Sequence, residues 1–204
     1  MIKYSIITTL CIALVSCSIN GKHDSLISES VNYEAKIDSI LALMTIEEKI
    51  GQMTQVDQQF LDTIQDIADL SIGSLLSGGG SNPDTNFFDS WTDMYDNFQE
   101  VALTSRLGIP LIYGIDAVHG HNNVYGATIF PHNVGLGCAN DYELTRKVSE
   151  ATAVEVAATG INWNFSPCIA IPEDERWGRH YEGYSEDPEI AVSYTHLRAH
   201  ETDY

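Results

Sequence analysis

Apolar side chains recur every three or four positions in several stretches of the chain, as they do along the buried face of an amphipathic helix. The first pattern begins at Glu34 and consists of Ile37, Ile40, Leu41 and Met44. The segment TIEE at 45–48 matches a capping box and predicts a second, short helix. A longer stripe is formed by Trp91, Met94, Tyr95, Phe98, Val101 and Ala102. A further helix is expected to start with Asn140 and Glu143 as capping residues and to end at Gly160.

Three short apolar runs have the length and composition of buried strands: 71–77, 111–115 and 161–166. Helical stretches separate these runs, and the alternation of strand and helix is typical of a parallel α/β fold. Along the third run one face is expected to hold Ile161, Trp163 and Phe165. The other face would then hold Asn162, Asn164 and Ser166, and a polar inner face fits a barrel strand near its functional end.

The N-terminus has the features of an export signal. Residues 1–17 read MIKYSIITTLCIALVSC, with one early Lys and an apolar run that is too short for a comfortable transmembrane helix. The ending LVSC resembles a bacterial lipobox, so we expect a lipoprotein signal peptide at 1–16, lipidation of Cys17 and a tether at 17–33. An ordinary signal with a nearby cysteine is the alternative. The lipoprotein would sit at the outer membrane, facing the periplasm or the cell surface.

The amino-acid composition limits the classes of partner that the protein can bind. The 204 residues include 29 acidic and 10 basic side chains, which gives a net charge of −19, and 44% of residues are hydrophobic. The hydrophobic fraction excludes a mostly disordered chain. The acidic balance argues against nucleic acid and against docking on an anionic membrane by charge, because both need clustered Lys and Arg. A neutral substrate is compatible with such a surface.

Two cysteines, Cys138 and Cys168, lie outside the signal region. In an oxidising compartment they could form one disulfide. We expect two buried free thiols instead, because a core of this size needs no cross-link.

Candidate chemistry follows two of the expected strands, since parallel α/β folds place their sites at the carboxyl ends of strands. Asp116 comes directly after the strand at 111–115, and Arg176 lies in a short loop after Ile171. A carboxylate and a guanidinium at a barrel mouth can bind the hydroxyls of a sugar. An ion pair between these two residues that braces the loops is an equally good interpretation.

Histidines in the same loop, together with Asp116, raise the question of a metal site. They are His119, His121 and His132, and their H-x-H spacing is a weak signal. We expect no metal and no organic cofactor, since phosphate-loop, dinucleotide-binding and zinc-protease motifs are all missing from the sequence.

The segment GIDAVHGHNN at 114–123, continued by FPHN at 130–133, resembles glycoside hydrolase family 3, the β-glucosidase and β-D-glucan exohydrolase family. RWGR at 176–179, YE at 181–182 and SEDP at 185–188 match the next block of the family in order and spacing. The resemblance covers about residues 34–191. It implies an N-terminal (β/α)8 barrel that removes terminal β-linked glucose from cellobiose, short β-glucans or β-glucosides, with retention of configuration.

The resemblance assigns Asp116 and Arg176 to the terminal glucose subsite. The family's nucleophile Asp and its acid/base match no position here, so the resemblance implies that both come after the end of this chain. Glu182, Glu186 and Asp187 are interpreted as loop-bracing or solvated acids. Residues 34–191 would supply about three of the eight barrel strands, and we expect this chain to be inactive and to aggregate when expressed alone.

Two other functions stay open. One is a short lipoprotein that binds glucosides without cleaving them. The other is a β-xylosidase of the same family, although xylosidase-like members tend to carry Glu where this chain has Asp116. The last segment, 192–204, matches nothing expected of the family and is interpreted as a divergent, non-native tail.

Overall fold

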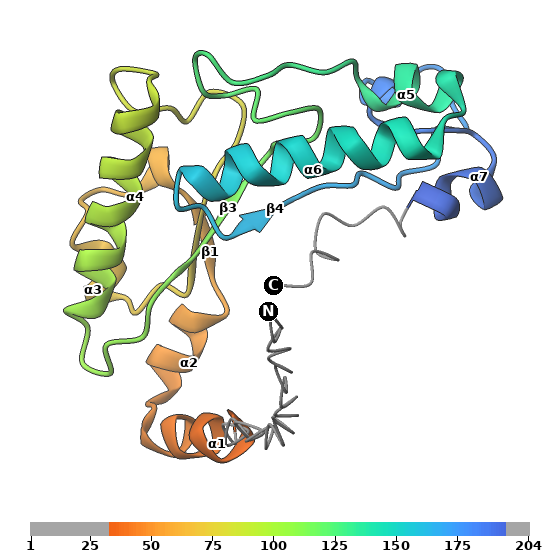
Figure 1. Cartoon of the computed structure of the whole chain (residues 1–204). Coiled ribbons are helices and arrows are strands. Elements are labelled where there is room, and N and C mark those ends of the chain that lie inside the picture. Colours follow the sequence, from red (N-terminus) through yellow and green to blue (C-terminus); the bar gives the residue numbers. More distant parts are fainter. Residues whose placement is uncertain (1–32, 195–204) are drawn as a thin grey trace, which may run out of the picture.

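The computed structural model describes residues 33–194, and Figure 1 shows their arrangement. A four-stranded parallel sheet is hydrogen-bonded in the order β1 (Gln55–Asp57), β2 (Ser74–Ser77), β3 (Ile112–Ile115) and β4 (Trp163–Asn164). The helices are α1 (Tyr33–Leu43), α2 (Ile46–Gln52), α3 (Asp66–Asp69), α4 (Phe88–Leu103), α5 (Asn133–Ala139), α6 (Tyr142–Ala158) and α7 (Pro188–Ser193). Short 3-10 turns lie at Gln58–Phe60 and His180–Glu182.

The strands follow one another in sequence order with helices between them, so the expected α/β architecture of a partial barrel is confirmed. Within residues 33–194 the sheet does not close, and β1 and β4 form its two edges. The sequence analysis missed β1, because its three residues are too few to show a period and only Val56 is apolar. It also made the last strand too long, since β4 contains only two residues.

The capping box before α2 is present as predicted. The Thr45 hydroxyl accepts a hydrogen bond from the Glu48 backbone N–H, and the Glu48 carboxylate accepts one from the Thr45 backbone N–H at 2.8 Å. The Arg106 guanidinium also binds Glu48, and this hydrogen bond lowers the pKa of Glu48 to about 2. The pair ties the start of α2 to the segment between α4 and β3.

The predicted cap of the long helix α6 was wrong by one residue. Asp141 is the N-cap, and its carboxylate accepts a hydrogen bond from the Leu144 N–H at 2.9 Å. Asn140 instead ends α5, in the left-handed conformation with φ of 49°. No helix was predicted at the position of α5. Gly160 follows α6 with φ of +82°, as expected, and a Cβ there would lie 2.6 Å from the Tyr95 ring.

The main core lies between one face of the sheet and the helices α3, α4 and α6. Tyr113 of β3 is fully buried and stacks on Phe98 of α4, with ring centroids 5.8 Å apart. Other members of this core are Ile67, Ile72, Leu75, Trp91, Leu111, Ile115, Val156 and Ile161. The predicted stripe on α4 therefore packs against the sheet.

The opposite face of the sheet corresponds to the inside of a barrel. Gly114 alternates with the core residue Tyr113, so it belongs to this inner face. The Phe165 ring covers Gly114, where a Cβ would lie 2.3 Å from the ring, and Trp163 packs on Phe165. The predicted polar inner face at β4 is therefore wrong. The amides at 162 and 164 bind the backbone of β3 and of the residue at 117 instead.

The predicted signal peptide at 1–16, the predicted lipidation site Cys17 and nearly all of the tether at 17–33 lie outside the described residues, as does most of the predicted tail. The predicted boundary at 191/192 falls inside α7, and Tyr194 after it is buried against Tyr184. Across residues 33–194 no helix has the length and apolar character needed to span a membrane.

Candidate functional site

Asp116 follows β3 directly and lies at the carboxyl end of the sheet. Its side chain is half-buried, and burial raises its pKa, while the positive charge of Arg179 acts in the opposite direction. The charges of Glu182 and Asp57 raise the pKa further. No hydrogen bond from another described side chain reaches this carboxylate. Asp116 therefore has free acceptor capacity at the position where parallel barrels carry their chemistry.

Arg179 is the guanidinium whose charge reaches Asp116. It lies at the start of the 3-10 turn His180–Glu182 and is held in a two-point contact with Glu182. Arg179 Nε and Nη2 donate to the two Glu182 carboxylate oxygens at 2.8 and 2.6 Å, and this contact lowers the pKa of Glu182. The Arg179 side chain is 65% exposed. Its other N–H groups can therefore donate to a ligand while Glu182 fixes its orientation.

The structure does not bring Arg176 to Asp116. Arg176 is 90% exposed, and its guanidinium donates to Asp174, with Nη2 to Oδ2 at 2.5 Å. The predicted ion pair between Arg176 and Asp116 is therefore not formed, while their shared binding of a sugar stays a prediction. The sequence analysis chose the first arginine of RWGR, whereas the structure places the second arginine, Arg179, in the neighbourhood of Asp116.

Asp57 is a second residue that the sequence analysis missed. It ends β1, and its Oδ1 accepts a hydrogen bond from Ser81 Oγ at 2.5 Å. A Cβ placed on Gly78 would lie 3.5 Å from Asp57 Oδ2 and 3.8 Å from Asp116 Oδ2, so the two carboxylates border the same space. The available sequence signal for Asp57 was its position directly after Val56, the single apolar residue of this short strand.

The histidines of the polar loop are arranged in two different ways. His119 and His132 lie ring against ring, with centroids 3.9 Å apart, and Tyr181 meets His132 edge-on. His119 Nδ1 donates to the Phe130 carbonyl at 2.8 Å. Among the described residues, no group of three or more His, Cys, Asp or Glu side chains is placed to hold a metal ion.

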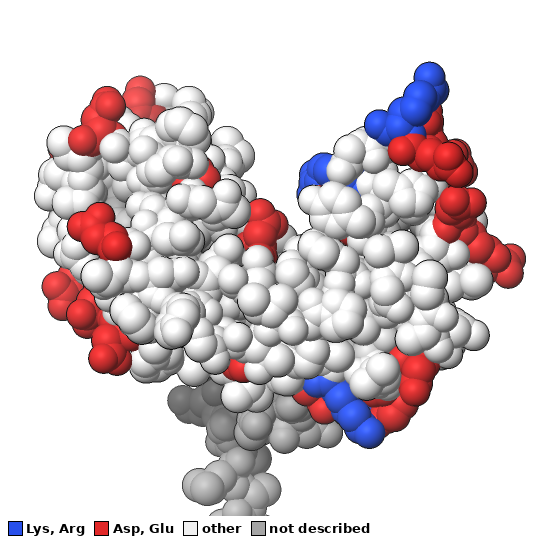
Figure 2. Space-filling model, turned by 90° about the horizontal axis from the view of Figure 1, so that it is seen from above, with Lys and Arg blue, Asp and Glu red and all other residues white. Residues whose placement is uncertain are grey.

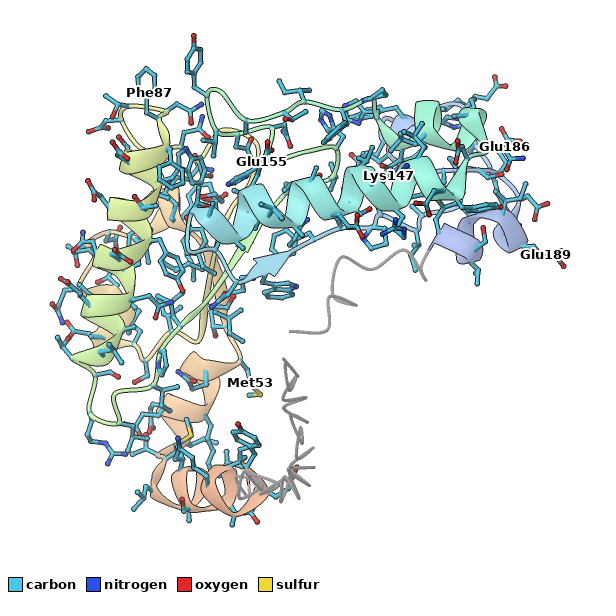
Figure 3. All side chains as sticks on the ribbon, in the orientation of Figure 1. Met53, Phe87, Lys147, Glu155, Glu186 and Glu189 are labelled. Atoms are coloured by element: carbon cyan, nitrogen blue, oxygen red, sulfur yellow. The ribbon has the colours of Figure 1, made fainter. Side chains whose placement is uncertain are left out.

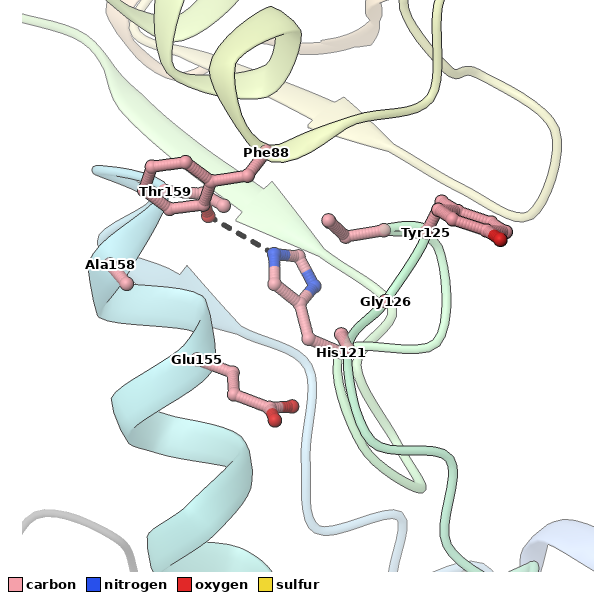
Figure 4. Close-up of a pocket in the computed structure, with 9 residues that line it drawn as sticks. Phe88, His121, Tyr125, Gly126, Glu155, Ala158 and Thr159 are labelled. Carbon is pink, nitrogen blue, oxygen red and sulfur yellow. Dashed lines mark hydrogen bonds between the residues drawn. The ribbon is translucent and has the colours of Figure 1, made fainter.

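His121 points into the molecule, where its ring meets the Trp91 ring edge-on. It is 1% exposed and lines a pocket of about 300 Å³ between α6, the start of α4 and the loop at 121–127 (Figure 4). Thr159 Oγ1 donates to the Val156 carbonyl, so it accepts from His121 Nε2 at 3.0 Å. This fixes the neutral tautomer with the proton on Nε2, and burial lowers the pKa of His121 to about 4.

The remaining candidate acids have structural contacts. Glu182 orients Arg179, and Asp187 is the N-cap of α7, which agrees with their interpretation as bracing acids. Glu186 lies at the outer edge of the molecule beside α7 (Figure 3). Cys138 and Cys168 are both free, but Cys138 is exposed and Cys168 is only partly buried, so the expectation of two buried thiols is wrong.

The molecule is hollowed between two lobes. Figure 2 looks down on it and shows acidic side chains at the floor of the hollow and basic side chains on one rim. A depression that offers both acceptors and donors suits a neutral ligand with many hydroxyls.

The fold and the strand-end residues define the chain as part of an α/β barrel protein with a polar site at its mouth. Residues 45–199 match the family model for the glycosyl hydrolase family 3 N terminal domain. The chain therefore belongs to glycoside hydrolase family 3.

Relatives and solved structures support this assignment. The chain is 35% identical over 184 residues to a lysosomal beta glucosidase of Dictyostelium discoideum, which covers 80% of this chain and 22% of the relative. It is 31% identical over 156 residues to a periplasmic beta-glucosidase of Salmonella typhimurium, with 76% and 19% covered. The crystal structure of an exo-1,3/1,4-beta-glucanase from a Pseudoalteromonas species is similar at a TM-score of 0.73 and 45% identity, over 80% of this chain and 21% of that one. The chain thus spans about one fifth of the length of these relatives.

Proposed function

We propose that this chain is the glucose-binding part of an exo-acting, retaining β-glucosidase that releases terminal β-linked glucose from cellobiose, short β-glucans or β-glucosides. The observation that carries the proposal is the placement of Asp116 and Arg179 at one end of a family 3 barrel sheet. Relatives named as β-glucosidases and an exo-β-glucanase support it. A β-glucosidase from Listeria innocua with a similar structure, at a TM-score of 0.64, has been solved in complex with laminaribiose.

The two side chains have complementary roles toward a sugar. Asp116 accepts hydrogen bonds from hydroxyls, and Arg179 donates to hydroxyl oxygens, so one ring can be bound by both at once. The partial burial of Asp116 strengthens such hydrogen bonds, because the carboxylate is partly removed from water. Arg176, whose side chain is 90% exposed, is proposed as a second binding residue toward the outer part of the substrate.

Cleavage with retention requires a nucleophile and an acid/base carboxyl group roughly 5–5.5 Å apart. We propose that these groups come from later parts of the barrel and of the full-length enzyme, after the end of this chain. Asp116 and Arg179 then fix the terminal ring so that its anomeric carbon faces that pair. No organic cofactor takes part, since the chemistry is carried by carboxyl groups.

The names of two relatives point to a second possible substrate, a β-xyloside. One relative is a periplasmic beta-glucosidase/beta-xylosidase of Dickeya chrysanthemi, at 26% identity, and another is a beta-xylosidase of Formosa agariphila, at 36% identity over 95 residues. The substrate test therefore includes a xyloside.

The last part of the proposal concerns the export of the protein and its attachment to the membrane. The relatives from Salmonella and Dickeya carry the word periplasmic in their names, and the N-terminal pattern of this chain is that of an exported lipoprotein. We propose that Cys17 carries a lipid anchor at the outer membrane. Mass spectrometry of the protein purified from membranes would show the diacylglyceryl mass on a chain that begins at Cys17, and an unmodified chain would contradict the anchor.

The experiment measures glucose release by the full-length protein from an aryl β-glucoside and xylose release from the matching β-xyloside. We expect turnover of the glucoside, with the β-anomer of glucose as the first product seen by NMR. Asp116→Asn is expected to lower kcat/KM by roughly 100-fold or more, because the interaction strengthens as the ring is held for cleavage. Preference for the xyloside would support the xylosidase function, and binding without turnover would support the non-catalytic lipoprotein.

A further inference from the structure

Asp57 and Asp116 project from the same face of the sheet. Asp57 of β1 is paired with Leu76 of β2, and Leu76 is paired with Gly114 on the inner face of β3. Val56, the residue before Asp57, packs against the core on the other face, so the Asp57 side chain points inward. Asp116 follows Gly114 by two residues and has the same orientation.

Gly78 keeps the space between these two carboxylates open. It comes directly after β2, the strand that lies between β1 and β3. A Cβ at this position would lie 3.5 Å from Asp57 Oδ2 and 3.8 Å from Asp116 Oδ2. A ligand group that enters this space therefore meets two carboxylate oxygens at once.

Asp57 is held in place by its other oxygen. Ser81 Oγ and the Gln59 backbone N–H donate to Oδ1 at 2.5 and 3.1 Å, and Ser81 is 2% exposed. Oδ2 receives one longer hydrogen bond, 3.3 Å from Gln59 Nε2, whereas a carboxylate oxygen can accept two. The oxygen that borders the open space is therefore the one with acceptor capacity left.

We infer that Asp57 is a second carboxylate of the sugar subsite, which accepts a hydroxyl hydrogen across the space at Gly78 from the ring that Asp116 and Arg179 hold. The inference rests on the proposed glucose-binding function. Two neighbouring carboxylates repel each other, and a neutral ring with adjacent hydroxyls gives each of them a donor without adding charge. A ring that lacks one of those hydroxyls leaves one carboxylate without its donor, so Asp57 adds selectivity for a fully hydroxylated ring.

The first test fills the space without changing any charge. In the full-length protein, Gly78→Ala places a methyl group between the carboxylates and is expected to weaken glucose binding, measured by isothermal titration calorimetry, about tenfold or more. Gly79→Ala is the matched control, because a Cβ there meets no atom within 4 Å. Neither glycine has a positive φ, so alanine fits the backbone at both positions.

The second test removes the charge. Asp57→Asn keeps the size of the side chain and is expected to weaken glucose binding about tenfold, the scale of one hydrogen bond to a charged group. Asp62→Asn, at an exposed position shortly after Asp57 in the chain, is the charge control, and this variant is expected to bind glucose as the wild type does. Circular dichroism checks that each variant is folded.

The outcomes separate this inference from the proposed function. Weaker binding in Gly78→Ala and Asp57→Asn, with normal binding in both controls, supports the inference. If Asp116→Asn loses glucose while Gly78→Ala and Asp57→Asn bind it normally, the role of Asp57 is refuted and the proposed function stands. If the wild-type protein does not bind glucose at all, the proposed function fails and the inference fails with it.

Discussion

Arg176 and Arg179 are three residues apart in one motif, yet they have different surroundings. Arg179 is fixed by both oxygens of Glu182 and its charge acts on Asp116, whereas Arg176 extends into solvent and binds Asp174. An arginine that is already oriented loses less entropy when it binds a ligand. At the residue scale, we therefore propose Arg179, and not Arg176, as the contact of the terminal sugar.

A pair of matched substitutions tests this assignment. Arg179→Lys keeps the charge but loses the two-point contact, and we expect glucose affinity in the full-length protein to fall roughly 10- to 100-fold. Arg176→Lys is expected to change affinity by less than about twofold, because its present contacts are solvent-exposed. A larger loss in Arg176→Lys than in Arg179→Lys, measured by calorimetry, would return the site to the pairing inferred from sequence.

His121 makes stability depend on pH. Its folded-state pKa of about 4 lies below the ordinary value of 6.5, so the folded state binds fewer protons than the unfolded state. The contribution of His121 to the free energy of unfolding is fully present above pH 6.5. It falls by about 3 kcal/mol as the pH is lowered toward 4. Urea unfolding at pH 7 and pH 4 measures the loss, and His121→Gln should show a smaller loss. An equal loss in both proteins would contradict the role of His121.

At the scale of elements, patterns that repeat over many residues were predicted correctly, whereas very short strands and strands with unusual contacts were not. The stripe on α4 and the capping box at Thr45 follow from local sequence, because a helix repeats its signal over many residues. β1 has only three residues, which are too few to show an alternation. The alternation at 161–166 is clear, but it assigned the polar face wrongly, because Asn162 and Asn164 bind backbone groups of β3 and of the residue at 117. Tertiary pairing decides such strands.

The arrangement of the candidate site was likewise predictable only in part. The strand-end position of Asp116 was predictable, because this residue follows a clear apolar strand. The nearby position of Asp57 was not predictable, because β1 is too short to recognise, and the proximity of Arg179 was not, because two arginines share one motif. The choice between them depends on the turn at His180–Glu182, which sequence alone does not orient.

The correction at the start of α6 gives a prediction for that helix. Asp141→Ala removes the side-chain acceptor of the Leu144 N–H and should lower the free energy of unfolding by ~1 kcal/mol. Asn140→Gly should change it little, since Asn140 has a positive φ that glycine adopts freely. Chemical denaturation of the two variants checks the difference. If Asn140→Gly destabilised the protein more than Asp141→Ala did, Asn140 would be the true cap.

At the scale of the whole molecule, the inner face of the open sheet leaves large apolar side chains in solvent. Ile112 is 51% exposed and Trp163 43% exposed, and Met53, at the end of α2, is 81% exposed and points toward the open side (Figure 3). In a closed barrel such residues would be covered. The exposed edges β1 and β4 add unpaired backbone groups.

We therefore expect residues 33–194, expressed alone, to self-associate and to show no glucosidase turnover. Size-exclusion chromatography with light scattering would detect the association. Replacing Ile112 and Trp163 with Ser and Gln should raise the monomer fraction, while Leu43→Gln, on the exposed surface of α1, should not. A soluble monomer without substitutions would show that this face needs no cover.

The measurement that tests the central claim most directly is a crystal structure of the full-length protein soaked with glucose. The account predicts one glucose at the carboxyl ends of β1 and β3, with its hydroxyls within hydrogen-bond distance of the Asp116 carboxylate and the Arg179 guanidinium. Glucose held elsewhere, or held at this end of the sheet with Arg179 turned away, would contradict it.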